Sequence, residues 1–133
     1  MPITLAPETL APARGYANGM LMPEGQLLFV AGQIGWNAQA RLVSPDFVPQ
    51  FDQALFNIVQ VLREGGSAPD HVGRLTIYVT DKKRYLASLP EVGAAYRKHM
   101  GKHYPAMALV EVADLLEEGA LVEIEATAVV PKG

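Results

Sequence analysis

The chain has 133 residues, a formal net charge of −3 and no cysteine. This length fits a single domain over residues 1–133. The mildly acidic net charge argues against a nucleic-acid backbone as the main partner. The lack of cysteine excludes disulfides, a cysteine nucleophile and a thiolate metal site. The first residues lack the pattern of a signal peptide and no apolar run reaches membrane-spanning length, so we expect a soluble cytoplasmic protein without a membrane partner.

The first quarter of the chain predicts an exposed arm followed by a hairpin. Prolines in residues 1–13 remove backbone donors, so only residues 3–5 are expected to form a short edge strand. Residues 15–22 and 26–31 are strand-like, and the Met-Pro-Glu-Gly sequence between them favours a tight turn, which predicts that these strands pair. The glycines within residues 32–35 allow the backbone to leave regular strand geometry or to approach a ligand closely.

The middle of the chain predicts two helices and one strand. Apolar residues recur at intervals of three and four over residues 47–62, after a Ser-Pro-Asp start at 44–46 and before the glycines at 65–66, which predicts a helix. Residues 74–80 are rich in β-branched side chains and alternate as a strand does. A second helix is expected over residues 88–100, where the opening Ser-Leu-Pro-Glu fits a capping box. The spacing of Leu89, Val92, Tyr96 and Met100 predicts its buried stripe.

Residues 104–130 form two strand-like runs that are joined by an acidic turn. In the second run, Glu123 and Glu125 alternate with apolar residues and therefore point to one face of a sheet. If the first run pairs with the second across the turn and its alanines and valines lie under helices, Met107 and Glu111 share the face of Glu123 and Glu125. This shared face is where we expect the function.

The predicted order is β-β-α-β-α-β-β, which indicates an α+β fold with two helices on one face of a single mixed sheet. The opposite face carries Leu121 beside the carboxylates and, under the same pairing, Met107 and Leu109. Apolar surface of this kind is most simply buried against other copies of the chain. We therefore expect a homo-oligomer.

Several short motifs, spread over nearly the whole chain, are similar to those of one known family. They are Gly15-Tyr16, Ala31-Gly32-Gln33-Ile34, the Gln50…Asn57…Gly65-Gly66 pattern, Tyr104-Pro105-Ala106, Val110-Glu111-Val112 and Val122-Glu123-Ile124-Glu125-Ala126. In these residues the chain resembles the RidA/YjgF-like proteins, imine and enamine deaminases that are also labelled L-PSP endoribonucleases. The resemblance implies a chorismate-mutase-like fold and a homotrimer with clefts between neighbouring subunits. It also implies hydrolysis of a small reactive enamine or imine to a carbonyl compound and ammonia, without a cofactor.

The residues that match the family imply a candidate site. Glu123 is the expected catalytic carboxylate, which handles the proton of the attacking water. Tyr16 also matches a pocket residue of the family. Ala31, Gly32 and Gln33 belong to the family's glycine motif and are expected to contact the substrate, although the family has a serine at the position of Ala31.

Two departures from the family concern the binding of the substrate. In the deaminases an arginine grips the substrate carboxylate where this chain has Met107, and an asparagine stands where it has Gly93. Removing one partner of a desolvated charge pair costs about 2–5 kcal/mol, so the resemblance implies a subgroup without this arginine and with a different substrate preference. Arg14, close to the expected cleft mouth, is a candidate for replacing the missing charge, with a solvated arginine as the simpler alternative.

Three kinds of function remain open from the sequence. The first is a hydrolytic imine or enamine deaminase, the second is a non-catalytic trimeric protein that binds a small metabolite, and the third, ranked last, is a ribonuclease. His99 and His103 have the spacing of metal ligands on a helix, but Gly101 lies between them and no metal site is expected.

Overall fold

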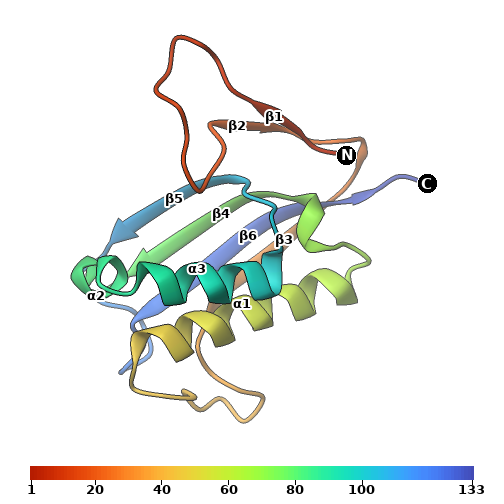
Figure 1. Cartoon of the computed structure of the whole chain (residues 1–133). Helices are drawn as coiled ribbons and strands as arrows, with labels where there is room; N and C mark the ends of the chain where they lie inside the picture. The colour runs from red at the N-terminus through yellow and green to blue at the C-terminus, as the bar shows by residue number, and fades with distance from the viewer.

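The computed structural model describes residues 1–133 and has two main layers, a sheet and the helices that pack on one of its faces (Figure 1). The strands are β1 (Ile3–Leu5), β2 (Gly19–Leu21), β3 (Gly25–Ile34), β4 (Val72–Val79), β5 (Ala106–Glu111) and β6 (Val122–Pro131). The helices are α1 (Phe47–Glu64), α2 (Lys82–Leu86) and α3 (Leu89–Met100), with a 3₁₀ turn at Pro69–His71. The predicted α+β architecture is confirmed, and the short helix α2 is added to it.

The main sheet has four strands in the order β3-β6-β4-β5. β6 pairs antiparallel with both β3 and β4, whereas β5 pairs in parallel with β4 at the edge of the sheet. The predicted pairing of β5 with β6 across the acidic turn is therefore wrong. α3 supplies the crossover that a parallel pair requires, and residues 112–121 then lead from the edge to the centre. The central position suits β6, because Val122 and Ile124 are fully buried.

The N-terminal residues form an arm that lies beside β5 rather than a hairpin with β3. β2 pairs with β1, and the backbone nitrogen of Ala17 donates a hydrogen bond to the carbonyl oxygen of Pro105 at 3.0 Å. The predicted pairing of residues 15–22 with residues 26–31 is wrong, because β2 pairs with β1 and β3 is an edge strand that pairs with β6 alone. Figure 1 shows the β1–β2 ribbon lying off the main sheet on the side of β5.

α1 is the principal helix of the core. Its predicted apolar stripe is buried, since Phe51, Leu55 and Ile58 are each at most 1% exposed. The helix begins at Phe47, slightly later than the Ser-Pro-Asp sequence predicts, and ends before the two glycines as expected. None of the helices has both the length and the apolar character needed to cross a lipid bilayer.

The buried side of α3 is largely the one predicted, whereas the start of the helix differs from the prediction. Val92, Tyr96 and Met100 are buried as predicted. The predicted capping box does not form, because the side chain of Ser88 makes no capping hydrogen bond. Leu89, which was expected in the buried stripe, is 47% exposed.

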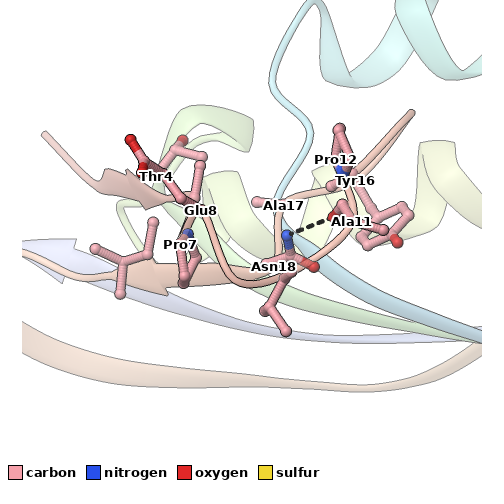
Figure 2. A pocket seen from close by; sticks show the side chains of 12 residues that line it. Thr4, Pro7, Glu8, Ala11, Pro12, Tyr16, Ala17 and Asn18 are labelled. Atoms are coloured by element: carbon pink, nitrogen blue, oxygen red, sulfur yellow. Dashed lines mark hydrogen bonds between the residues drawn. The ribbon is translucent and has the colours of Figure 1, made fainter.

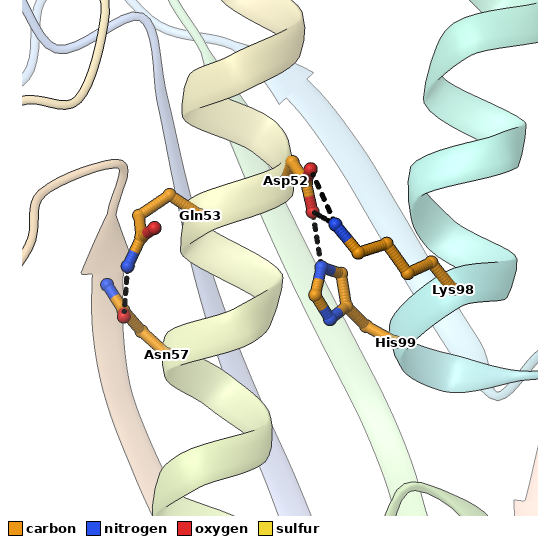
Figure 3. A network of polar contacts seen from close by, with 5 residues as sticks. All are labelled: Asp52, Gln53, Asn57, Lys98 and His99. Atoms are coloured by element: carbon orange, nitrogen blue, oxygen red, sulfur yellow. Dashed lines mark hydrogen bonds and ion pairs between the residues drawn. The ribbon is translucent and has the colours of Figure 1, made fainter.

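Polar side chains hold α1 against its neighbours, as Figure 3 shows. Asp52 of α1 contacts His99 of α3, and its Oδ2 lies 3.2 Å from Nζ of Lys98. Burial disfavours the charged form of Asp52, but the hydrogen bonds and charges of His99 and Lys98 outweigh this effect and hold the pKa of Asp52 below its ordinary value. On the other side of α1, Nδ2 of Asn57 donates to the carbonyl oxygen of Ile34 at 3.1 Å and so fixes the end of β3.

Candidate functional site

The two faces of the main sheet differ in what covers them. α1 and α3 cover one face, where Leu75, Ile77 and Ile124 are no more than 5% exposed. The other face has no helix, and β4 and β6 place polar side chains on it, namely Arg74, Thr76, Tyr78, Glu123, Glu125 and Thr127. The predicted catalytic carboxylate therefore lies on the helix-free face, as expected for Glu123 and Glu125.

The carboxylate of Glu123 lies against the backbone of Gly32 on the neighbouring strand. A Cβ atom at position 32 would lie 2.2 Å from Oε2 of Glu123 and would collide with it. The register of β3 and β6 shifts between Val30 and Gln33, which makes a bulge at this point. A glycine at this position leaves room for the carboxylate, which any larger residue would displace. The structure thus brings two predicted site residues, Gly32 and Glu123, into contact.

Ala31 and Gln33 flank Gly32 in the same bulge. Ala31 is exposed, and its carbonyl oxygen accepts a hydrogen bond from Nε2 of Gln33 at 3.1 Å. The amide of Gln33 is therefore bound to its own strand. Both residues lie next to the contact of Gly32 with Glu123.

Tyr78 is a residue of the helix-free face that the sequence reasoning missed. It is the cross-strand partner of Glu123. Partial desolvation and the negative charges of Glu125 and Glu123 raise the pKa of Tyr78 above its ordinary value. Its phenol is protonated at neutral pH, and its hydrogen bond with the Glu125 side chain contributes to the raised pKa. The alternation of residues 74–80 contained the signal, because it puts Tyr78 on the side opposite to Leu75 and Ile77.

Met107 lies on the helix-covered face, so its predicted position beside Glu123 is wrong. In the parallel pair of β4 and β5, Met107 is the partner of Leu75, which is fully buried under the helices. The predicted position of Glu111 on the Glu123 face is wrong as well. Its Oε1 accepts a hydrogen bond from the backbone nitrogen of Lys82 at 2.9 Å, at the start of α2. Both errors follow from the assumed β5–β6 pairing.

Met107 lines a cavity of about 160 Å³ between β5, α1 and α3. The wall is mainly aliphatic and aromatic, and the other residues that form it are Gly15, Phe51, Ile77, Tyr85, Leu89, Val92, Gly93, Tyr96 and Tyr104. The rings of Tyr96 and Tyr104 stack with their centroids 5.1 Å apart. Burial raises the pKa of Tyr96, so this phenol is neutral over the physiological range. Gly93 and Met107 therefore share one cavity, which we call the Met107 cavity.

Tyr16 and Arg14 belong to the N-terminal arm and do not contact Glu123. Tyr16 is 42% exposed and lines a groove of about 490 Å³ against residues 4–13, which Figure 2 shows from close by. Its neighbour Gly15 has a φ of +75° and lines the Met107 cavity. Arg14 is exposed and lines neither space. The turn at Gly15 thus separates Tyr16 from the cavity that its neighbour helps to form.

The two histidines with the spacing of metal ligands have different partners. His99 contacts Asp52 (Figure 3), whereas Nε2 of His103 lies 2.7 Å from the carbonyl oxygen of Val72. No group of three or more histidine, cysteine, aspartate or glutamate side chains lies close enough together to hold a metal ion.

Sequence relatives support the resemblance that the motifs indicate. A model of the family described as Endoribonuclease L-PSP matches residues 6–130. The chain is 33% identical over 125 residues to a protein named DfrA from Myxococcus xanthus, covering 93% of this chain and 89% of that protein. It is 31% identical over 125 residues to a goat protein named 2-iminobutanoate/2-iminopropanoate deaminase, covering 93% of this chain and 84% of the goat protein.

Solved structures agree with the sequence relatives. The crystal structure of YyfB from Yersinia pestis, described as a Rid-family protein of unknown function, has a TM-score of 0.83 and 34% sequence identity, covering 96% of this chain and 98% of that one. A Mycobacterium tuberculosis protein of the YjgF/YER057c/UK114 family has a TM-score of 0.65 and 36% identity, covering 87% of each chain. The chain therefore belongs to the endoribonuclease L-PSP family, the Rid or YjgF proteins, and has their chorismate-mutase-like α+β fold.

Proposed function

We propose that this protein hydrolyses a small imine or enamine to a carbonyl compound and ammonia, with Glu123 as the acid–base residue. The observation that carries the proposal is the contact of Glu123 with Gly32, because the absence of a side chain at position 32 gives the carboxylate its place on the helix-free face. The name of the goat relative, which is 31% identical, supports the same chemistry. Tyr78, a protonated phenol that is the cross-strand partner of Glu123 and a hydrogen-bond partner of Glu125, lies beside the proposed acid–base residue.

The reaction needs one group that accepts a proton and returns it. Water attacks the iminium carbon while Glu123 accepts the water proton, so that a C–O bond forms and the C=N bond becomes single. Glu123 then gives the proton to the nitrogen of the resulting carbinolamine. As the C–N bond breaks and the C=O bond forms, the Glu123 carboxylate accepts the proton of the carbinolamine hydroxyl group and passes it to the departing ammonia, which leaves as ammonium. An iminium carbon is already electrophilic, so this sequence requires positioning and proton transfer rather than further activation.

The complete site is proposed to lie between copies of the chain. Within one chain, Glu123 and the Met107 cavity lie on opposite sides of the sheet. Glu123 of one copy and the Met107 cavity of another belong to one cleft only if the helix-free face of the first copy meets the edge of the second copy's sheet. Leu27 and Phe29 of that face are 66% and 74% exposed, which supports its burial in an assembly. The proposed assembly is the homotrimer that the family resemblance implies.

The assembly has a direct test in solution. Light scattering at micromolar concentration is expected to give the mass of three chains for the wild-type protein. Phe29→Glu is expected to reduce this mass, because a charge in the centre of an apolar interface is costly to bury. Phe56→Glu is the matched control, since Phe56 is 45% exposed on α1, on the helix layer. A monomeric wild type, or an equal effect of both variants, would contradict the proposed interface.

The catalytic role of Glu123 is tested with Glu123→Gln. Imines are generated in situ from a panel of amino acids, and the release of ammonia is measured above the uncatalysed rate. Loss of a general acid–base group typically lowers the rate about 10²- to 10⁴-fold, and we expect a loss of at least about 100-fold. Glu118→Gln is the control because Glu118 is an exposed glutamate in the turn before β6. An unchanged rate in Glu123→Gln, or an equal loss in Glu118→Gln, would remove Glu123 from this role.

A non-catalytic binding protein is the second candidate, and the Met107 cavity is the observation that favours it. The resemblance implies an arginine at position 107, whereas the cavity wall there is apolar. If the wild-type trimer hydrolyses none of the imines but binds small molecules in this cavity, the second candidate is the correct one. RNA cleavage is not proposed, because Glu123 and Glu125 put negative charge on the helix-free face, where it repels phosphates.

A further inference from the structure

Asn57 connects the middle of α1 to the chain that leaves β3. Its side chain is partly buried, and its Nδ2 donates to the carbonyl oxygens of Ile34 and Trp36 at 3.1 and 3.0 Å. Its Oδ1 accepts a hydrogen bond from Nε2 of Gln53, one turn earlier on α1, at 2.9 Å (Figure 3). The reverse orientation of the amide would put Oδ1 against two carbonyl oxygens, so these three bonds fix how the Asn57 side chain lies.

The backbone that Asn57 holds lies opposite the proposed acid–base residue. Ile34 is the cross-strand partner of Glu123, and it comes two residues after Gly32, which the Glu123 carboxylate contacts. The bulge between Val30 and Gln33 interrupts the β3–β6 ladder, so the strand pairing alone holds this stretch less firmly. The place of Gly32 beside the carboxylate therefore depends on the helix layer, on the other side of the sheet.

Gln50 holds the strand that carries Glu123 in a similar way. It lies two turns before Asn57 on the same side of α1, and its Oε1 accepts a hydrogen bond from the backbone nitrogen of Leu121 at 2.8 Å. Leu121 comes two residues before Glu123. Gly35 lets the chain from β3 pass close to the helix, since a Cβ there would lie 2.5 Å from the Cα of Gln50. Two amides of α1 thus anchor both strands of the proposed site.

We infer that Asn57 is a positioning residue of the hydrolysis, which acts on Glu123 through β3 from the opposite side of the sheet. Asn57 holds the end of the bulge, so that Glu123 keeps the place beside Gly32 from which it reaches the attacking water. Gln53 contributes by fixing the orientation of the Asn57 amide. The inference rests on the proposed function, since it names a further residue of the same site, but the place of Gly32 is measured separately from hydrolysis.

The first test is kinetic and uses variants that circular dichroism shows to be folded at the assay temperature. Asn57→Ala is expected to lower kcat at least about tenfold and to leave KM unchanged, because a misplaced catalytic group slows the chemical step and not substrate binding. Leu62→Ala is the matched control. Leu62 is fully buried in the same helix, at the end that lies against Leu28 near the start of β3. This control is expected to lower the melting temperature at least as much as Asn57→Ala and to keep kcat.

A double-mutant cycle tests whether Asn57 acts through Glu123. In the Glu123→Gln protein, Asn57→Ala is expected to cause no further loss, because the group that it positions is already absent.

Variants of Gln53 test the direction of the hydrogen bonds. Gln53→Glu replaces the donor by a carboxylate, which only accepts, so the Asn57 amide is expected to turn and present its oxygen to the carbonyl oxygen of Ile34. This variant is expected to lose about as much kcat as Asn57→Ala, and Gln53→Leu is expected to lose less. Because Gln53 is only partly buried, Gln53→Glu takes the place of Asn57→Ala if the latter does not fold.

The second test follows Gly32 by NMR in the full chain without a substrate. Ala31-Gly32 is the only Ala-Gly pair of the sequence, so ¹³C-carbonyl alanine together with ¹⁵N-glycine selects the amide signal of Gly32. This signal is expected to shift in Glu123→Gln, because the carboxylate contacts Gly32. It is also expected to shift in Asn57→Ala and to stay in place in Leu62→Ala.

Three results would overturn the inference. The first is a kcat of Asn57→Ala that is no lower than that of Leu62→Ala. The second is a loss in the Glu123→Gln background as large as the loss in the wild type, and the third is a Gly32 signal that stays in place in Asn57→Ala. If the wild type hydrolyses no imine, the proposed function fails, and the Gly32 signal alone decides whether Asn57 positions Glu123.

Discussion

Replacing Gln50 by leucine is expected to lower the free energy of unfolding by roughly 3 kcal/mol or more. Gln50 is fully buried in α1, and its amide makes three hydrogen bonds to backbone groups, one of them six residues before it and the other two 69 and 71 residues after it. Nε2 donates to the carbonyl oxygens of Ser44 and Gly119 at 2.9 and 3.0 Å, and Oε1 accepts from the nitrogen of Leu121 at 2.8 Å. Leucine fills a similar volume but leaves three groups unpaired, at about 1–3 kcal/mol each when buried.

Denaturant unfolding at one fixed protein concentration measures this effect. Gln60→Leu is the control, because Gln60 lies on the exposed side of the same helix and is expected to change stability by about 0.5 kcal/mol or less. If Gln50→Leu unfolds at the same denaturant concentration as Gln60→Leu, water replaces the lost hydrogen bonds and Gln50 is not the anchor of the loop before β6. Gly35 is part of the same arrangement, since a Cβ there would lie 2.5 Å from the Cα of Gln50.

Leu55→Ala is expected to destabilise the protein by about 2–5 kcal/mol. Leu55 is fully buried at the centre of α1, in the cluster that joins the helix to the sheet through residues such as Ile58 and Ile124. Truncation removes apolar contacts and leaves a cavity that the surrounding helix and strands can only partly close. The shift of the denaturation midpoint, with the slope unchanged, gives the loss directly.

Val61→Ala on the same helix provides the comparison for Leu55→Ala. Val61 is an apolar residue beside this stripe and is 37% exposed. Its truncation is expected to cost much less than that of Leu55, because the mutated site stays partly in water and forms no closed cavity. Equal losses for the two variants would mean that α1 presents a different side to the sheet.

The sequence by itself determined the elements whose signals are local. Apolar residues that recur every three or four positions determined α1 and its buried side, since an α-helix has 3.6 residues per turn whatever it packs against. The alternation in residues 74–80 and 122–128 determined β4 and β6 and put Glu123 and Glu125 on one face. The family motifs determined the fold, because they are spread along nearly the whole chain.

Only the tertiary structure decided which strands pair and which side of β5 is covered. Alternation defines two sides of a strand but does not say which one faces the core, and in β5 both sides are apolar, with Met107 and Leu109 on one and Ala108 and Val110 on the other. In the parallel pair with β4, Met107 and Leu109 are the partners of Leu75 and Ile77, which are buried under the helices. Met107 and Leu109 therefore lie on the helix-covered face. The contacts of Glu123 with Gly32, and of Asn57 with Ile34, depend in turn on pairings and side-chain directions that no local pattern encodes.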